Sequence, residues 1–124
     1  MNKHTLIDKI RIGLIGFEAY LIEDDNKLQA FAIFLDDSKD PLLLFQKDKK
    51  NEKIDITLNV KITDEIQSLK SKDSTVRKEH FKIFQQFVLE SEQKAKEMVF
   101  KDKRLHYITD VQLLRSIQEA YLID

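Results

Sequence analysis

The sequence predicts an α+β domain in which a four-stranded antiparallel β-meander packs against two or three C-terminal helices. Residues 53–62 alternate between polar and apolar side chains, which is the pattern of a strand with one buried face. Short polar turns separate the earlier apolar runs, and short connections favour antiparallel pairing. Beyond residue 63, apolar residues recur every three or four positions, as they do on the buried face of a helix.

The meander is expected to span about residues 17–62. Its turns contain Asp, Asn, Ser and Lys, because the chain has only two glycines and one proline. Asp and Asn suit turns because they bond to nearby backbone and tolerate left-handed conformations. The second strand is apolar at almost every position, which is typical of a central strand that is covered on both faces. The four strands are expected at 17–23, 28–35, 42–46 and 53–62.

A short helix over about residues 5–12 is expected before the meander. Thr5 with Asp8 three residues later resembles a helix N-terminus, and Ile7, Ile10 and Leu14 would share one helical face. The segment 10–12 alternates apolar and polar residues and is equally compatible with the start of a strand. Both interpretations stay open at this point.

Three helices are expected after the sheet, at about 64–71, 75–100 and 110–122. Asp73 or Ser74 is the expected cap of the long middle helix. Thr109 and Gln112 match a capping box for the last one. The chain contains no linker, repeat or low-complexity segment, so residues 1–124 are expected to form a single domain. The buried stripe of the middle helix is expected to contain Phe81, Phe84, Val88, Ala95 and Met98.

The composition is that of a highly charged globular domain. Hydrophobic residues make up 42% and charged residues 35% of the 124 positions, with a net charge of −1. Residues 1–62 carry 10 basic against 11 acidic side chains and residues 63–124 carry 11 against 11, a balance that disfavours nucleic-acid binding. The absence of cysteine excludes disulfides, thiol nucleophiles and thiolate zinc sites. The scarcity of glycine argues against phosphate-cradling loops.

The location expected from the sequence is the cytoplasm. Charged residues interrupt the first eleven positions every few residues, whereas a signal peptide needs a continuous apolar stretch. No segment approaches the roughly 20 apolar residues that span a bilayer, so no membrane association is expected.

One face of the expected sheet has an unusual composition. If Glu23 pairs with Leu28, three alanines share this face inside a rim of larger apolar side chains. Either a helix of the chain covers this face, or the face is a groove for a partner or for a second copy of the chain. A shift of the pairing by one residue would exchange the two faces. The alanines are Ala19, Ala30 and Ala32, and the rim consists of Phe17, Phe34, Leu43 and Phe45.

Candidate chemical groups are few and all have structural explanations. Asp102, His106 and Asp110 have the spacing of a metal-binding face on a helix, but the helix is expected to break near residue 103. The lysine-rich segment 47–53 matches a solvated turn, with nucleic-acid binding as the alternative. The acidic turn 36–40 lacks the spacing and the glycine of a calcium loop. We therefore expect no catalytic residue, no metal ligand and no cofactor.

The function expected from these features is that of a small soluble, non-catalytic protein-binding module, such as an inhibitor, an immunity protein or a dedicated chaperone. Its partner would be another protein, with a homodimer as one form of that binding. The alternative is a small-ligand-binding protein or enzyme with a pocket between sheet and helices that uses Tyr20, His80 or His106. In the first hypothesis the apolar anchors are Phe17, Phe34, Leu43 and Phe45, and the charged rim is Asp36, Asp37 and Asp40.

Overall fold

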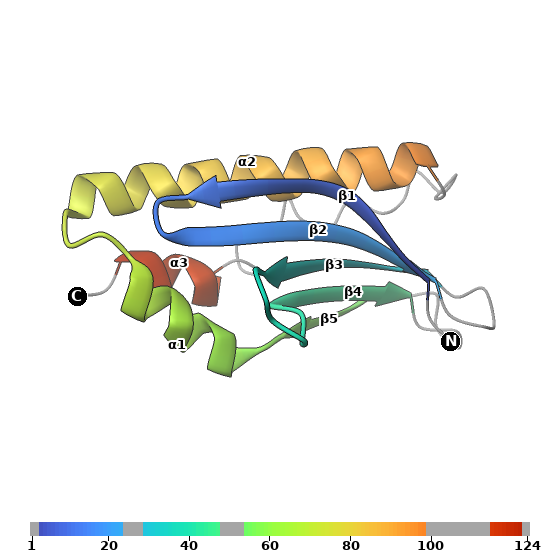
Figure 1. Cartoon of the computed structure of the whole chain (residues 1–124), viewed down its shortest axis with the longest axis horizontal. Helices are drawn as coiled ribbons and strands as arrows, with labels where there is room; N and C mark the ends of the chain where they lie inside the picture. The colour runs from blue at the N-terminus through green and yellow to red at the C-terminus, as the bar shows by residue number, and fades with distance from the viewer. Residues whose placement is uncertain (1–2, 24–28, 48–53, 99–114, 123–124) are drawn as a thin grey trace.

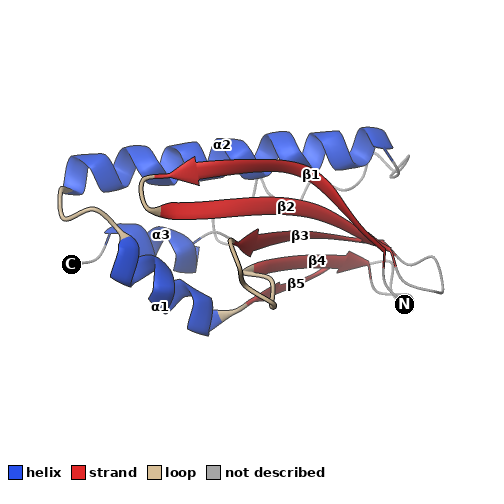
Figure 2. Cartoon of the chain, viewed as in Figure 1, coloured by secondary structure: helices blue, strands red, loops and turns tan. Residues whose placement is uncertain are grey.

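The sheet precedes the helices in the chain, which confirms the predicted α+β fold class (Figures 1 and 2). The computed structural model describes residues 3–23, 29–47, 54–98 and 115–122. Within these ranges, five strands form one antiparallel sheet in the order β1-β2-β3-β4-β5. The strands are β1 (Lys3–Ile12), β2 (Ile15–Glu23), β3 (Gln29–Leu35), β4 (Leu43–Lys47) and β5 (Ile54–Leu58); the helices are α1 (Val60–Leu69), α2 (Ser74–Met98) and α3 (Arg115–Leu122).

The N-terminal segment is a strand, so the expected helix over 5–12 is wrong and the meander gains a fifth strand. Leu6 pairs with Tyr20 but Asp8 pairs with Ala19, which leaves Ile7 as the extra residue of a β-bulge. Because the bulge shifts the phase of the alternation, Ile7 and Ile10 both pack against the core although they are three residues apart. Their helix-like spacing in the sequence is therefore produced by an irregular strand.

A tight hairpin joins β1 to β2. Ile12 pairs with Ile15, so only Gly13 and Leu14 form the loop. Gly13 has a φ of 60°, the conformation that glycine adopts at the first central position of a type II′ turn. A β-carbon at Gly13 would lie 2.9 Å from Cε1 of His80 on α2. The turn thus needs glycine both for its backbone conformation and for its close approach to the helix.

The pairing of β2 with β3 differs by one residue from the expected pairing. Glu23 pairs with Gln29 rather than with Leu28, so five residues connect the two strands instead of four. Since side chains alternate with a period of two, this single residue moves the whole of β3 to the opposite face relative to β2. Ala19 therefore shares a face with Ile33, and Ala32 shares the other face with Tyr20.

Helix α2 begins one residue before its predicted start, whereas α1 begins four residues before its own; α3 is described from Arg115, and the residues at its predicted start lie outside the described ranges. Residues 60–62 continue the alternating pattern of β5 but belong to α1, and Asn59 stands at the N-cap position of that helix. Asp73 caps α2, since its Oδ1 accepts hydrogen bonds from the backbone N–H groups of Thr75 at 2.8 Å and Val76 at 3.3 Å. The proposed capping box at 109–112 lies outside the described residues.

The core lies between one face of the sheet and the helices. Phe17 of β2 meets Phe84 of α2 with ring centroids 4.9 Å apart, and Tyr121 of α3 lies against Phe81 and Phe84. Burial raises the pKa of Tyr121. Figure 1 shows α2 running along β1, with α3 between α2 and α1. None of the described helices combines the length and the apolar character needed to cross a membrane. The buried face of the sheet includes Ile15, Phe17, Ala19, Leu21, Phe31, Ile33, Leu35, Leu43 and Phe45.

An ion pair attaches the C-terminal half of α2 to β1. Lys94 Nζ lies 2.8 Å from Oδ2 of Asp8, next to the bulge. The hydrogen bond from Lys94 lowers the pKa of Asp8, and a hydrogen bond from the backbone N–H of Lys9 lowers it further. The same hydrogen bond raises the pKa of Lys94.

The substitution Gly13→Ala is expected to lower the free energy of unfolding by about 1–3 kcal/mol, because alanine at this φ is strained and its β-carbon would crowd His80. Urea denaturation measures the effect. Leu14→Ala in the same turn is the control, since Leu14 is 73% exposed and its truncation should change stability by less than about 0.5 kcal/mol. Equal losses in the two variants would contradict the proposed role of the turn.

The Asp8–Lys94 pair is expected to make stability depend on pH in a defined way. The lowered pKa of Asp8 adds stability above its ordinary value of 3.8, and this is lost as the pH falls through the folded-state pKa. The raised pKa of Lys94 adds stability below 10.5, and this is lost as the pH rises through the folded-state pKa. Lys94→Met should therefore destabilise the protein at pH 7, and the difference from the wild type should shrink as the pH falls below 3.8.

Urea denaturation at a series of pH values measures this difference. Lys78→Met, which removes an exposed cation elsewhere on α2, is the control. A destabilisation by Lys94→Met that stays constant from neutral to acidic pH would show that the ion pair does not cause it.

Candidate functional site

The candidate site is the sheet face opposite the core, which we call the open face. Among the described elements no helix lies across this face, which is turned toward the reader in Figure 1. The strand pairing arranges its side chains in rows across the sheet. The first row is His4, Ile22, Ala30 and Gln46; the second is Leu6, Tyr20, Ala32 and Leu44; the third is Lys9, Glu18 and Phe34; and Arg11 and Gly16 follow.

The first two rows of the open face are mainly apolar. An antiparallel sheet with one solvated face normally alternates apolar side chains inward with polar side chains outward. Strands β2 and β3 break this rule. Their residues Ile22, Ala30 and Phe34 are apolar but lie on the face of the sheet opposite the core. Leu6 on β1 is 47% exposed. Ala30, Ala32 and Phe34 are at most 8% exposed, so the accessible apolar surface of the open face comes from Leu6 and from the half-buried Ile22, Tyr20 and Leu44.

Three rings form a cluster on this face. The rings of Tyr20 and Phe34 meet edge to face, with centroids 5.5 Å apart and an interplanar angle of 87°. His4 lies 6.0 Å from the Tyr20 ring and 6.4 Å from the Phe34 ring. Phe34 is only 8% exposed, whereas Tyr20 is half-buried and His4 is exposed. Phe34 is therefore the base of the cluster, and the other two rings form its accessible surface.

The hydroxyl of Tyr20 is held in place within the sheet. It donates a hydrogen bond of 3.0 Å to Oε2 of Glu18, two residues away on the same strand. Partial burial raises the pKa of Tyr20, and the hydrogen bond to Glu18 together with the charges of Glu18 and Asp36 raises it further. Tyr20 thus acts as a neutral donor with a fixed ring, which is the form of tyrosine that suits a binding surface.

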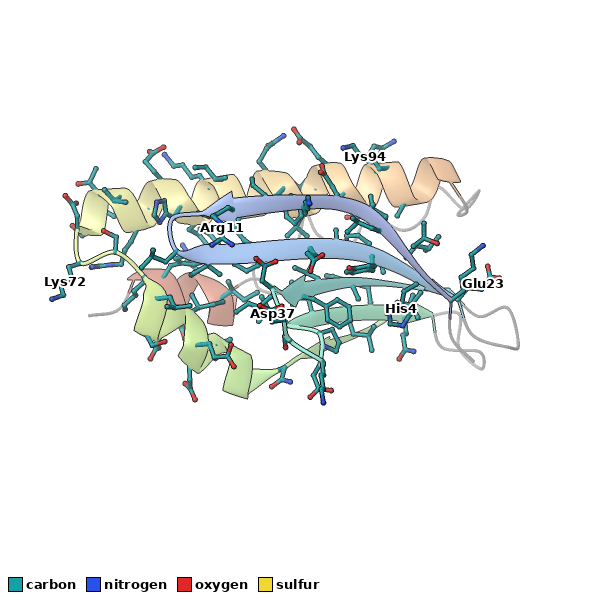
Figure 3. The ribbon with its side chains drawn as sticks, in the orientation of Figure 1. His4, Arg11, Glu23, Asp37, Lys72 and Lys94 are labelled. Atoms are coloured by element: carbon teal, nitrogen blue, oxygen red, sulfur yellow. The ribbon has the colours of Figure 1, made fainter. Side chains whose placement is uncertain are left out.

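Charged side chains occupy one end of the open face. Nη2 of Arg11 lies 3.0 Å from Oδ2 of Asp36, and both groups are substantially exposed. Gly16 lies beside this pair, and a β-carbon there would overlap the Asp36 carboxylate. The backbone N–H of Asp36 also donates a 3.0 Å hydrogen bond to the carbonyl of Gly16. Figure 3 shows Arg11 at this end of the face and His4 at the other. A hollow of about 400 Å³ here is lined by Lys9, Ile10, Arg11, Glu18 and Asp36.

The acidic turn after β3 borders this charged end. The backbone N–H of Ser38 donates to the carbonyl of Leu35 at 3.1 Å, and Asp37 adopts a φ of 62°. The hydroxyl of Ser38 donates to the carbonyl of Asp40 at 2.9 Å. Asp36, Asp37 and Asp40 are all exposed, so the turn places three carboxylates beside the open face.

The structure separates the predicted apolar anchors. Phe17, Leu43 and Phe45 lie on the core face and are at most 3% exposed, so they support the fold. Phe34 alone lies on the open face, together with Ala30 and Ala32 but without Ala19. The expected grouping of the four anchors around three alanines is wrong, because it depended on the incorrect β2–β3 pairing.

The histidines and the candidate metal set contribute no assembled chemical site in the described ranges. His80 packs under the hairpin at Gly13, and His4 belongs to the ring cluster. His106, Asp102 and Asp110 lie outside the described residues, as do most of the lysine-rich segment 47–53. Among the described residues, no group of three or more acidic and histidine side chains is placed to hold a metal ion.

The alternative pocket between sheet and helices also lacks its predicted residues. Tyr20 faces the open side of the sheet. A groove of about 480 Å³ lies between α2 and α3, but its lining includes neither Tyr20 nor His80. This lining is Thr75, Lys78, Glu79, Phe81, Lys82, Gln85 and Gln118.

Sequence reasoning missed the outer part of the open face. The expected helix over residues 5–12 includes Leu6 and begins after His4, and the alternative pocket places Tyr20 between the sheet and the helices. The available signal was Gly13, since an apolar alternation that ends in a glycine-containing tight turn predicts a hairpin. That hairpin would have placed Leu6 beside Tyr20.

The glycine at position 16 is expected to permit the Arg11–Asp36 ion pair. A double-mutant cycle with Arg11→Ala and Asp36→Ala should give a coupling energy of up to about 1 kcal/mol, the usual limit for an exposed pair. In a Gly16→Ala background the coupling should fall toward zero, because the new β-carbon takes the place of the carboxylate. Urea denaturation supplies the free energies.

The Glu79–Lys82 pair on α2, with 3.6 Å between Lys82 Nζ and Glu79 Oε1, is the matched control. Its coupling should be the same in both backgrounds. An Arg11–Asp36 coupling that survives Gly16→Ala would contradict this account of the charged end.

Comparisons of the chain with protein-family models, with curated proteins and with solved structures gave no match. The open face is therefore interpreted from its own geometry.

Proposed function

We propose that this chain is a non-catalytic protein-binding module, of the inhibitor, immunity-protein or dedicated-chaperone type, that acts in the cytoplasm. It binds another protein through the open face. The observation that carries the proposal is the pair of apolar rows on a sheet face that no described helix covers. The exposed Leu6 and the half-buried Ile22, Tyr20 and Leu44 give these rows accessible apolar surface, and accessible apolar patches on monomeric proteins often mark binding sites.

The arrangement within the open face supports a protein partner. Protein interfaces combine an apolar, aromatic centre with a polar rim, and tyrosine is enriched at their energetic centres. Tyr20 and Leu6 supply the accessible centre, and the Arg11–Asp36 pair supplies part of the rim. In this proposal the acidic turn with Asp37 and Asp40 extends the rim.

The charge of the rim favours protein over nucleic acid as the partner. The hollow at the charged end is lined by two cations, Lys9 and Arg11, and two anions, Glu18 and Asp36, and the acidic turn adds Asp37 and Asp40. A nucleic-acid surface needs an excess of cations to neutralise phosphates. A rim with both signs and no excess of cations is instead suited to a protein partner that carries both signs.

A photo-crosslinking amino acid at position 6 tests the proposal, with the same probe at position 14 as its control. Both leucines belong to the β1–β2 hairpin and both are exposed, but only Leu6 lies on the open face. The probe at 6 should capture a partner that the probe at 14 does not. Capture of nucleic acid, of equal material at both positions or of nothing at position 6 would refute the proposal.

Binding of the captured protein, once purified, is expected to depend on Tyr20. Tyr20→Ala should weaken the affinity at least about tenfold, or ~1.4 kcal/mol, because tyrosines at the centre of an interface often contribute this much or more. Ile83→Ala on α2 removes an exposed apolar side chain that lies away from the open face and should leave the affinity unchanged. Isothermal titration calorimetry measures both, and an unchanged affinity for Tyr20→Ala would count against this surface.

A further inference from the structure

Strand β1 forms one edge of the described sheet, and the strand pairing determines which of its backbone groups face outward. The carbonyl of Gly16 accepts a hydrogen bond from the backbone N–H of Asp36, so it points away from β1. Arg11 and Gly16 are therefore a non-hydrogen-bonded pair, and such pairs alternate with hydrogen-bonded ones along an antiparallel ladder. The backbone N–H and C=O groups of Arg11 and of Lys9, two residues earlier, consequently point away from β2.

Part of this outward edge is free to bind a further strand. The N–H of Lys9 donates a 2.8 Å hydrogen bond to Oδ1 of Asp8, so a side chain already occupies that position. Among the described residues, the carbonyl of Lys9 and the backbone N–H and carbonyl of Arg11 have no hydrogen-bond partner. The available stretch is short, because it lies between the bulge on one side and the Gly13 turn on the other.

The flank of α2 forms a floor beside this stretch. Figure 1 shows α2 running along β1. Ile83 of α2 is 41% exposed, so accessible apolar surface lies next to the edge of the sheet. The acidic side chains here already have partners, since Asp8 pairs with Lys94 and Glu90 accepts a hydrogen bond from Gln86. The space between the two elements, which we call the edge groove, is a hollow of about 220 Å³ lined by Asp8, Lys9, Ile10, Ile83, Gln86, Phe87 and Glu90.

The cations of β1 determine the charge of a strand that fits. Directly opposed residues of neighbouring strands point to the same face, so residues opposite Lys9 and Arg11 would lie beside these cations. Arg11 is 64% exposed although it pairs with Asp36, and Glu18 lies farther from the edge, on β2. Basic residues on an edge strand repel a basic strand. Acidic residues are therefore the complement at both positions.

The position between these acidic residues faces the other way. It would lie opposite Ile10, whose side chain packs against the core, and would therefore point toward α2. There it meets Ile83 at the exposed apolar part of the edge groove. The segment that complements this edge thus has the pattern acidic–apolar–acidic.

We infer that the edge groove binds an extended acidic segment of a protein partner, which adds to β1 as an antiparallel strand. Strand addition to an exposed sheet edge is a recurring mode of peptide recognition, in which main-chain hydrogen bonds give affinity and side-chain pockets give specificity. Here the main-chain bonds involve Arg11 and Lys9, and the specificity comes from their cationic side chains and from Ile83. The edge groove is a different surface from the open face, so the inference goes beyond the proposed function and does not depend on it.

Fluorescence anisotropy with a labelled peptide, Ser-Thr-Glu-Val-Glu-Thr-Ser, and the full chain tests the inference. The peptide should bind with a Kd below about 1 mM. Exchanging both glutamates for lysine should weaken binding at least about tenfold, because attraction to Lys9 and Arg11 becomes repulsion. Methylation of the first glutamate's backbone nitrogen should weaken it about fivefold, since this N–H donates to the carbonyl of Arg11. Methylation of the valine nitrogen, which points away from β1, should leave binding unchanged.

A matched pair of variants on α2 locates the binding surface. Ile83→Asp should weaken binding of the glutamate peptide at least about tenfold, because it places an anion in the edge groove against the valine and close to the glutamates. Leu89→Asp makes the same change at a side chain of similar exposure, 38% against 41%, that does not line the groove, and it should leave binding unchanged. Circular dichroism checks that both variants fold.

Several outcomes would overturn the inference. One is a glutamate peptide that does not bind the wild type at concentrations up to about 1 mM. Equal binding of the lysine peptide would refute the role of the cations, and equal binding of the two N-methylated peptides would refute strand addition. Equal effects of Ile83→Asp and Leu89→Asp would place the peptide elsewhere on the molecule.

Discussion

The pairing of Ala19 with Ile33 fixes which side chains of the central strands are buried. With this pairing Phe17, Phe31 and Ile33 point toward α2 and α3, and Tyr20, Ala32 and Phe34 point away. A shift of one residue would place Phe34 against the helices and leave Ile33 in water. Both faces of β3 are apolar, so composition alone does not penalise the shifted pairing. The bulky residues of β2, β4 and α2 decide it, since Phe31 contacts Phe45 and Phe17 contacts Phe84.

The geometry of β1 determines which side chains form the outer edge of the open face. The bulge at Ile7 lets Ile7 and Ile10 both cover the core, and it sets Leu6 beside Tyr20 on the opposite face. The Gly13 turn then returns the chain so that Arg11 lies across from Gly16 and reaches Asp36. Two glycines in a chain of 124 residues thus shape one end of the candidate site. The same bulge and the exposed Lys9 and Arg11 also hinder edge-to-edge pairing of β1 with another sheet.

The sequence supported the fold class, strands β2 to β4 and the start of α2, because apolar runs separated by short polar turns mark the strands and apolar residues recur every three or four positions along the helix. Predictions from the sequence failed where a single residue changed which positions of a repeating pattern face the core, or where a pattern continued past the end of its element. The helix-like spacing of Ile7 and Ile10 came from a bulge, and the alternation through Ile62 continued past the end of β5 into α1. The candidate site depended on a turn length between Glu23 and Gln29 that composition does not determine. The four expected anchors, Phe17, Phe34, Leu43 and Phe45, could not be separated without the pairing, which places Phe34 alone on the open face.

The rigidity of the ring cluster bears on how the open face can bind. Ordering a flexible side chain at an interface costs about 0.5–1.5 kcal/mol, which subtracts from the affinity. Tyr20 is already held by its hydrogen bond to Glu18 and by the edge of Phe34, and Phe34 is itself almost fully buried. Alanines 30 and 32 have no side-chain rotamers to lose. The centre of the open face therefore has little conformational freedom left to lose on binding, so even a small contact area there can give measurable affinity.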